Sequence, residues 1–238
     1  MSSIILGDCV DILFTMESES VDMIITDPPY GIDYRSNRQG IDRKSSIETR
    51  KDTVVRTSYF KEIKNDQSLP YEWLDGAYRL LKEGSAIYIF CHWSMWGELQ
   101  GHVNNAGFKV KNMLVLKKSN HGMGDLKGSY APKHELVLFA TKGRHILNFP
   151  DGREKDVIDV PVKFSGARRL HPNEKPESWY APFILNSSNE GDTVLDPFFG
   201  SGTVGVVCNK LNRKYIGIEI DEAYYNDATQ RLGLSGWV

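Results

Sequence analysis

The sequence predicts an α/β fold built on a largely parallel, buried sheet. Two observations lead to this fold class: short apolar runs rich in β-branched residues are bounded by turn residues, and they alternate with stretches whose apolar residues recur at helical spacing. Alternating strands and helices are typical of a parallel sheet covered on both faces, whose strands read as continuous apolar runs. The sequence contains no apparent internal repeat.

Seven strands and six helices follow from these patterns, each strand as an apolar run and each helix as a periodic stretch. The expected strands are Ser3–Leu6, Val21–Thr26, Ala86–Phe90, Lys109–Leu116, Glu135–Ala140, Thr193–Leu195 and Tyr215–Ile218. The expected helices are Asp8–Met16, Tyr71–Lys82, Met95–Asn105, Ser178–Ser187, Thr203–Leu211 and Glu222–Leu232. Asp221, directly before the last helix, is a candidate N-cap.

Composition narrows the class of protein. The 238 residues are 40% hydrophobic and 25% charged, which fits one globular domain with at most a large insertion. No apolar run approaches the ~20 residues that a membrane-spanning helix needs, and the N-terminus lacks the basic start of a secretory signal. Cys9, Cys91 and Cys208 are scattered without CxxC spacing. We therefore expect a cytoplasmic protein with neither a disulfide framework nor a bound metal.

Charge is segregated along the chain although the net charge is only −2. Residues 35–64 hold nine Lys and Arg against four acids, residues 109–175 hold fourteen against seven, and the rest holds six against twenty. Basic stretches on an acidic scaffold suit a polyanion such as a nucleic acid. The alternative is that Lys and Arg simply populate solvated loops.

A glycine turn near the C-terminus has the pattern of a nucleotide-binding βαβ unit. The segment DTVLDPFFGSGT leads into a helix and then a strand that ends at an acid. Gly200, Gly202 and Gly205 satisfy G-x-G-x-x-G, and Glu219 lies 19 residues after Gly200, where an acid accepts hydrogen bonds from a ribose. The alternative is a tight turn whose small residues serve packing.

The residues around this turn favour S-adenosylmethionine over a dinucleotide. Asp196 precedes the glycines, where its negative charge disfavours a pyrophosphate but suits a cationic ligand. Nineteen residues follow Glu219, which leaves no room for a second mononucleotide half. S-adenosylmethionine offers a ribose, an adenine, an ammonium and a sulfonium, without phosphate.

A second motif, VDMIITDPPY, brings an acid to the carboxyl end of an expected strand, where α/β sheets place their ligands. The two prolines remove backbone donors and stiffen the turn. The Asp27 carboxylate and the Pro28 carbonyl then form a rigid group of acceptors beside the Tyr30 ring, which suits the exocyclic amine of a planar base. A turn without chemistry is the alternative, since Asp-Pro often begins turns.

VDMIITDPPYG together with LDPFFGSGT resembles the DNA amino-methyltransferases that modify adenine N6 or cytosine N4. Because DPPY precedes the glycine motif, the order is similar to that of their circularly permuted β group. HPNEKP, residues 171–176, is similar to the H-P-x-x-K-P box of the family, and IGIEIDEAYYNDATQRL resembles its ribose-binding acid and following helix. Arg35–Lys64 and Ser119–Leu170 match poorly.

The resemblance implies a fold and a domain plan. The fold is a Rossmann-like S-adenosylmethionine-dependent methyltransferase fold, circularly permuted, with a mostly parallel sheet and one antiparallel strand. A single domain would span residues 1–238, with 35–64 a basic loop insertion and 119–170 a DNA-contacting, target-recognition region. Ser3–Leu6 would supply the strand expected after the last helix, which brings Asp8 near the cofactor adenine; the alternative for Asp8 is an N-cap. Members of the β group are often homodimers.

The implied activity is direct methyl transfer from S-adenosylmethionine to the N6 amine of a flipped adenine in DNA, as in the methyltransferases of restriction-modification systems. DPPY occurs more with adenine enzymes and SPPY more with cytosine enzymes. A C5-cytosine enzyme would need a cysteine after a proline, and none of the three cysteines follows one. Cytosine N4 methylation, RNA methylation and a catalytically silent nucleic-acid-binding module stay open as alternatives.

Specific residues carry these expectations. Glu219 would bind the ribose hydroxyls, and Phe198 would pack near the adenosine, whereas Phe199 would belong to the core. Lys175 and His171 would face the carboxylate of the cofactor. The alternative for His171 is a structural hydrogen bond. The expected catalytic residues are Asp27, Pro28, Pro29 and Tyr30. The expected cofactor-binding residues are Asp8, His171, Lys175, Asp196, Pro197, Phe198, Gly200, Ser201, Gly202, Thr203, Glu219 and Asp221. The expected DNA-binding residues are Arg35, Arg38, Arg43, Lys44, Arg50, Lys51, Arg56, Lys117, Lys118, Lys127 and Lys133.

Overall fold

A computed structural model describes residues 2–29, 71–122, 127–149, 152–161 and 175–234. The chain divides into two compact units, one made of residues 1–28 and 70–238 and the other of residues 29–69. All described residues except Pro29 belong to the first unit.

The first unit contains the predicted strands and helices and one further strand. The strands are β1 (Ser3–Leu6), β2 (Val21–Thr26), β3 (Leu81–Cys91), β4 (Lys109–Lys118), β5 (His134–Thr141), β6 (Val157–Val160), β7 (Thr193–Asp196) and β8 (Lys214–Glu219). The helices are α1 (Cys9–Thr15), α2 (Trp73–Leu80), α3 (Trp96–Asn105), α4 (Glu177–Ser187), α5 (Thr203–Lys210) and α6 (Glu222–Arg231). A 3₁₀ turn, Trp93–Met95, precedes α3.

Two differences from the predicted elements have local causes. The strand β6 was missed because its sequence, VIDV, is short and only Val160 is buried, so it forms no continuous apolar run. The helix α2 ends at Leu80, two residues before the predicted end. Leu81 turns into an extended conformation, and it pairs with Val21 at the start of β2.

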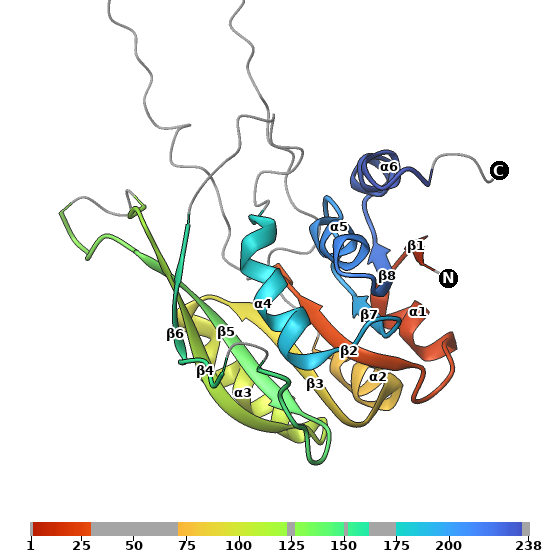
Figure 1. Ribbon diagram of the computed structural model, residues 1–238, viewed down its shortest axis with the longest axis horizontal. Coiled ribbons are helices and arrows are strands. Elements are labelled where there is room, and N and C mark those ends of the chain that lie inside the picture. The colour runs from red at the N-terminus through yellow and green to blue at the C-terminus, as the bar shows by residue number, and fades with distance from the viewer. Residues whose placement is uncertain (1, 30–70, 123–126, 150–151, 162–174, 235–238) are drawn as a thin grey trace, which may run out of the picture. The chain divides into compact units, whose positions relative to one another are not determined.

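The eight described strands form one sheet in the order β1-β8-β7-β2-β3-β5-β4-β6 (Figure 1). The strand β5 runs antiparallel to both of its neighbours, β3 and β4, and every other described pair is parallel. The prediction of a mostly parallel sheet with one antiparallel strand is therefore confirmed.

The N-terminal strand completes the sheet beside the last strand of the chain. β1 pairs in parallel with β8, from Ser3 opposite Ile216 to Leu6 opposite Glu219. No further strand follows α6 within the described residues. The prediction that Ser3–Leu6 takes the place of a strand after the last helix is confirmed, and this is the circular permutation of the fold.

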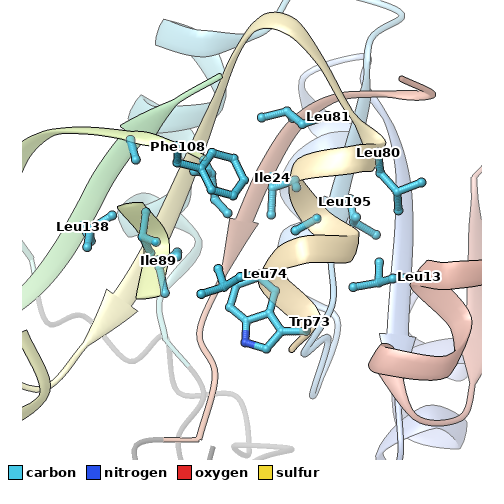
Figure 2. Close-up of a cluster of buried hydrophobic side chains, with 14 of the residues drawn as sticks. Leu13, Ile24, Trp73, Leu74, Leu80, Leu81, Ile89, Phe108, Leu138 and Leu195 are labelled. Carbon is cyan, nitrogen blue, oxygen red and sulfur yellow. The ribbon is translucent and has the colours of Figure 1, made fainter. Parts of the chain in front are cut away.

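Three of the described helices cover each face of the sheet. Helices α1, α2 and α3 contribute to one apolar cluster, with Leu13, Trp73 and Leu74 among its fully covered side chains (Figure 2). Helices α4, α5 and α6 contribute to the cluster on the other face. Because both faces are covered, residues that alternate along β2, such as Ile24 and Ile25, are both fully buried, which explains why the strand reads as an apolar run.

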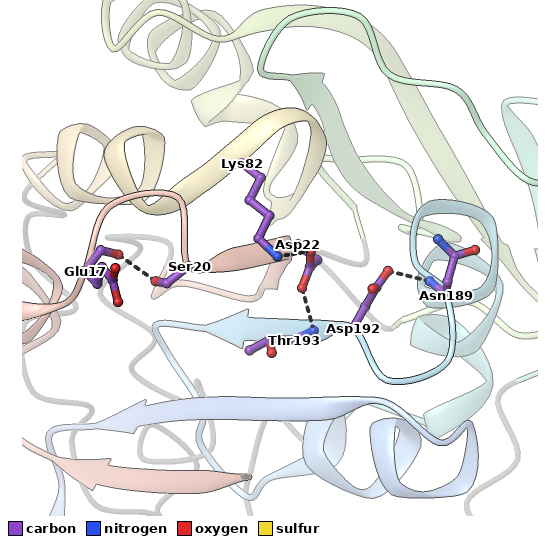
Figure 3. Close-up of polar contacts among 7 residues, drawn as sticks. All are labelled: Glu17, Ser20, Asp22, Lys82, Asn189, Asp192 and Thr193. Atoms are coloured by element: carbon purple, nitrogen blue, oxygen red, sulfur yellow. Dashed lines mark hydrogen bonds and ion pairs between the residues drawn. The ribbon is translucent and has the colours of Figure 1, made fainter.

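Polar contacts hold the amino-terminal ends of β2 and β7 together (Figure 3). The Asp22 carboxylate accepts a hydrogen bond from the Thr193 backbone N–H at 2.9 Å and pairs with the Lys82 ammonium at 2.6 Å. The Asp192 carboxylate accepts from the Asn189 N–H at 2.7 Å and closes the turn before β7. These contacts lie at the edge of the sheet opposite to the strand ends that carry the two sequence motifs.

The helices that the structure describes include none with the length and apolar character needed to cross a membrane.

Candidate active site

The two sequence motifs meet at the carboxyl ends of neighbouring strands. β2 and β7 pair in parallel, with Ile24 opposite Leu195. The segments that follow, Asp27–Pro28 and Pro197–Phe198, therefore leave the sheet side by side. The Thr26 hydroxyl donates a hydrogen bond of 2.7 Å to the Asp196 carboxylate across this junction. Asp27 and Pro28, which open the DPPY turn, thus share one edge of the sheet with the glycine turn, although Thr26 and Asp196 lie 170 residues apart in the chain.

Asp27 forms an ion pair with Lys175, whose ammonium hydrogen-bonds the carboxylate Oδ2. The side chains of Lys175 and Asp27 are only 9% and 17% exposed. The same ammonium lies 5.0 Å from the centre of the Phe90 ring on β3, a distance at which a cation is attracted to the face of an aromatic ring. The sequence predicted that Lys175 faces a cofactor carboxylate; its partner in the structure is the acceptor carboxylate of the DPPY turn.

Asp196 is almost completely buried, with 3% of its surface exposed. Burial raises the pKa of its carboxyl to about 7, and the negative charges of Asp27 and Glu219 act in the same direction. Hydrogen bonds from the Thr26 hydroxyl and the Phe198 backbone N–H oppose the shift. The ionised form would gain from a cation bound beside it, so this group suits a positively charged ligand.

Glu219 organises the glycine turn. Its carboxylate is buried and accepts backbone hydrogen bonds from Gly200 at 2.7 Å and from Asp221 at 2.8 Å. Burial raises the pKa of this carboxyl as well. The backbone carbonyl of Glu219 accepts from the Gly7 N–H at 2.9 Å, which ties the end of β1 to the same place. Each carboxylate oxygen can accept more than one hydrogen bond, so hydroxyl groups of a ligand can still be bound.

The glycines of the turn serve two purposes. Gly200 has φ +51° and open space where a Cβ would be, so the backbone can approach a ligand here. Gly202, with φ +79°, is the N-cap residue directly before α5. By contrast, a Cβ on Gly205 or Gly217 would come within 2.8 Å or 2.4 Å of the Phe199 ring. Phe199 is buried and stacks on Tyr215, so the prediction that it belongs to the core is confirmed.

Phe198 lies edge-on to Trp73 of α2, with ring centres 5.4 Å apart. The Trp73 indole is buried, and its Nε1–H has no hydrogen-bond partner among the described residues. A buried donor without a partner is unusual, and an additional acceptor such as a ligand is one explanation. Sequence reasoning missed Trp73, since a tryptophan on the buried face of a helix looks like an ordinary core residue.

A side chain of the last helix, α6, hydrogen-bonds the glycine turn. The Arg231 guanidinium on α6 donates to the Ser201 carbonyl at 3.0 Å and to the hydroxyls of Ser201 and Thr203 at 3.3 Å. Ser201 and Thr203 are buried, as is Pro197. No local signal in the sequence singles out Arg231, because it lies about 30 residues from the turn that it contacts.

Two acids act as N-caps. The Asp221 carboxylate accepts from the Ala223 N–H at 2.8 Å at the start of α6, as predicted. The Asp8 carboxylate accepts from the Val10 N–H at 2.8 Å at the start of α1, which confirms the capping alternative for this residue. Asp8 also follows Gly7 at the end of β1, so it lies at the same edge of the sheet as Glu219.

Four of the expected DNA-binding residues lie in the described part of the chain: Lys117, Lys118, Lys127 and Lys133. They lie at the carboxyl end of β4 or in the connection to β5, at the same sheet edge as the end of β3 because β4 and β3 run in the same direction. Lys117 pairs with Asp159 at 2.9 Å and Lys118 with Glu135 at 2.8 Å, so part of their charge is offset. Lys127 and Lys133 are exposed.

The other expected site residues lie outside the described residues. They are Tyr30, Arg35, Arg38, Arg43, Lys44, Arg50, Lys51, Arg56 and His171. Pro29 is described and partly buried, and it begins the second unit.

The described groups of the site fit a positively charged ligand that contains adenosine. The negative charges of Asp27 and Glu219 both act on the buried Asp196 carboxyl, the backbone at Gly200 is open, and the Nε1–H of the buried Trp73 can donate to an acceptor. The described part of the chain contains no group of three or more His, Cys, Asp or Glu side chains arranged to hold a metal ion.

Comparison with known proteins gives consistent matches. The family described as DNA methylase matches residues 21–230. The type II methyltransferase M.HpaI of Haemophilus parainfluenzae is 32% identical, over 96% of this chain and 73% of the relative. The crystal structure of the M1.HpyAVI–SAM complex has a TM-score of 0.72 and 25% identity, and the similarity covers 98% of this chain and 100% of the other. PvuII DNA methyltransferase (cytosine-N4-specific), 16% identical with a TM-score of 0.71 over 96% of this chain and 85% of the other, shares the fold.

Proposed function

The chain belongs to the DNA methylase family, whose members modify adenine N6 or cytosine N4, and from this premise we propose that it transfers the methyl group of S-adenosylmethionine to the N6 amine of adenine in DNA. The observation that carries the proposal is the 2.7 Å hydrogen bond between Thr26 and Asp196. Because this bond joins the strand that delivers Asp27 to the strand that delivers the glycine turn, an amine acceptor and a cofactor turn share one edge of the sheet.

Binding of the cofactor is assigned to the glycine turn and its neighbours. Glu219 accepts hydrogen bonds from the ribose hydroxyls, and the Gly200 backbone allows close approach. Phe198 packs against the adenosine, with Asp8 at the same edge near the adenine. Asp196 supplies negative charge toward the methionine end. The sulfonium of the bound cofactor supplies an electrophilic methyl group.

The acceptors of the DPPY turn activate the amine of the target base. The lone pair of an exocyclic amine is delocalised into the ring, so the amine is a poor nucleophile at rest. Hydrogen bonds to the Asp27 carboxylate and the Pro28 carbonyl favour a pyramidal nitrogen and stabilise the positive charge that develops on it. Alignment of the reacting groups contributes much of the rest, on the scale of about 7–11 kcal/mol available to well-oriented reactants. A base inside a duplex cannot reach such a turn, so it is flipped out of the helix.

An Asp27→Ala variant tests the proposal. Binding of S-adenosylmethionine, measured by calorimetry, should survive, whereas transfer of a tritiated methyl group to DNA should collapse. Asp192→Ala is the matched control, because Asp192 closes a turn at the opposite edge of the sheet (Figure 3). Full activity of the Asp27→Ala variant would remove Asp27 from the mechanism.

Methylation of cytosine N4 is the second candidate, favoured by the fold shared with a cytosine-N4-specific enzyme. The aspartate that opens DPPY supports adenine, because SPPY is more frequent in cytosine enzymes. Digestion of DNA modified by the protein and identification of the methylated nucleoside separate the two. Recovery of N4-methylcytosine without N6-methyladenine would exclude the proposed base.

DNA contact is assigned to the basic stretches at residues 35–64 and 119–170. The exposed Lys127 and Lys133, at the edge of the sheet that carries the site, support this assignment for the second stretch. Contacts of lysines with phosphates position a duplex without reading its sequence. Single-molecule sequencing of DNA from cells that express the protein would report the modified base and its sequence context together.

A further inference from the structure

The Lys175–Asp27 ion pair joins two segments that the sequence keeps 148 residues apart. Lys175 lies directly before Pro176, the residue that caps α4, whereas Asp27 follows β2. Both side chains are largely withdrawn from solvent. Two opposite charges that are largely withdrawn from solvent stabilise each other, because removing one leaves the other partly buried without this ion pair.

A second contact holds the ammonium of Lys175 from the side of β3. Phe90 is fully buried, and its ring centre lies 5.0 Å from the Lys175 Nζ. β3 is the direct neighbour of β2, with Ile89 opposite Thr26. The Lys175 ammonium is therefore held by the Phe90 ring on β3 and by the Asp27 carboxylate at the end of β2.

The charges of the site explain why a cation is useful at this point. Asp27 is close enough to Asp196 that its negative charge contributes to the raised pKa of the Asp196 carboxyl, and Glu219 acts in the same way. Three carboxylates at one edge repel one another. Lys175 places a positive charge against Asp27 and so reduces this repulsion.

We propose that Lys175 is the positioning residue of the DPPY turn: its ammonium holds the Oδ2 atom of Asp27 and so orients the carboxylate toward the amine of the target base. The inference rests on the proposed function, in which Asp27 is the acceptor. A carboxylate held by a fixed donor does not need to reorganise when the amine arrives, which is how preorganised sites accelerate reactions. Lys175 donates a hydrogen bond and adds no covalent step.

The effect of Lys175 on methyl transfer can be separated from its effect on cofactor binding. In Lys175→Ala and Lys175→Met variants, single-turnover methyl transfer at saturating cofactor should slow by about 10–100-fold, the scale expected when a reacting group loses its alignment. The dissociation constant of S-adenosylmethionine, measured by calorimetry, should stay within about twofold of that of the wild type, because the ammonium is engaged by Asp27. The methionine variant keeps the length of the side chain, so it controls for changes in packing.

The matched control is Lys210→Ala. Lys210 pairs with Glu177 at 2.5 Å at the first turn of α4, close in sequence to Lys175, but the Lys210 side chain is 63% exposed. Removal of an exposed pair has little effect on stability. The Lys210→Ala variant should match the wild type in both measurements.

Chemical rescue distinguishes an orienting hydrogen bond from a merely structural role. Methylammonium or ethylammonium added to the Lys175→Ala variant should restore part of the transfer rate, since these ions carry N–H donors. Tetramethylammonium, with the same charge and no N–H, should not. In an Asp27→Asn background, removal of Lys175 should slow transfer by less than about threefold, because the two residues act as one unit.

The outcomes that would overturn the inference differ from those that would overturn the proposed function. A Lys175→Ala variant with normal transfer at saturating cofactor but weak cofactor binding would show that Lys175 serves the cofactor carboxylate. Equal rescue by tetramethylammonium would also contradict the orienting hydrogen bond. In both cases the wild type still methylates DNA. Absence of methyl transfer by the wild type would instead contradict the proposed function.

Discussion

The Thr26 hydroxyl donates a 2.7 Å hydrogen bond to the Asp196 carboxylate, and both groups are buried at the point where β2 and β7 end. This is a direct side-chain link between the strand that leads into Asp27 and the strand that leads into the glycine turn. A shift of β2 along β7 would break this hydrogen bond. The bond therefore fixes the position of one turn relative to the other along the strand direction. The burial that stabilises this hydrogen bond also raises the pKa of the Asp196 carboxyl.

Replacing Asp196 by Asn should stabilise the protein at high pH. Burial raises the pKa of the Asp196 carboxyl from 3.8 to about 7, so between these values the unfolded state loses a proton that the folded state keeps. The stability of the wild type therefore falls as the pH rises from about 4 to 7, by at most about 4 kcal/mol from this group. Urea unfolding of both proteins at pH 5 and pH 8 should show the advantage of the Asp196→Asn variant growing with pH. An advantage of the same size at both pH values would contradict the raised pKa.

Replacing Gly217 by Ala should destabilise the protein by about 1–3 kcal/mol. A Cβ at this position would lie 2.4 Å from the Phe199 ring, which is buried and has no space to retreat without disturbing its neighbours. Gly101→Ala is the opposite case: Gly101 lies inside α3 with nothing within 4 Å of the added methyl, and the change should stabilise by about 0.5–1 kcal/mol. Urea unfolding curves measure both, and a neutral Gly217→Ala variant would refute the packing of Phe199.

The three cysteines should be unreactive in the native protein. Cys9, Cys91 and Cys208 are buried, and burial raises the pKa of each thiol to about 12. The thiolate, which is the reactive form, is therefore scarce at pH 8. Labelling with a chromogenic disulfide reagent should detect no rapidly reacting thiol in the native protein and three reactive thiols in denaturant. Methyl transfer should likewise survive iodoacetamide, in agreement with a mechanism without a cysteine nucleophile; rapid native labelling would argue against the buried positions.

Binding to DNA should weaken steeply with salt, and the lysines at the β4–β5 connection should contribute unequally. Each phosphate contact that a substitution removes should reduce the slope of log affinity against log salt by about 0.9. Lys133→Ala should remove about one such contact, since Lys133 is exposed and its side chain forms no ion pair with another described residue. Lys117→Ala should have a smaller effect, because Lys117 already pairs with Asp159. Fluorescence anisotropy at several salt concentrations measures the slopes, and a flat dependence for the wild type would count against phosphate contacts here.

Much of the fold could be predicted because local patterns specify it. The continuous apolar run Val21–Thr26 indicates a strand covered on both faces, and β2 has these bounds. Asp221 before a periodic stretch indicates an N-cap, and its carboxylate makes the capping bond. β6 was missed because a four-residue strand with one buried side chain has no periodicity to detect.

Local patterns also located both turns of the site, since proline and glycine constrain the backbone wherever they occur. What the tertiary structure alone decided is the partner of each side chain. Lys175 bonds to Asp27, Arg231 to Ser201, and Trp73 lies against Phe198 with a donor that no described residue satisfies. These contacts join residues that are far apart in the chain, and a hydrogen bond depends on positions in space to within a fraction of an ångström. The sequence by itself located the two turns and their acids. The packing of the sheet and its helices determined which groups meet there, and it brought in Trp73 and Arg231, which no local pattern identifies.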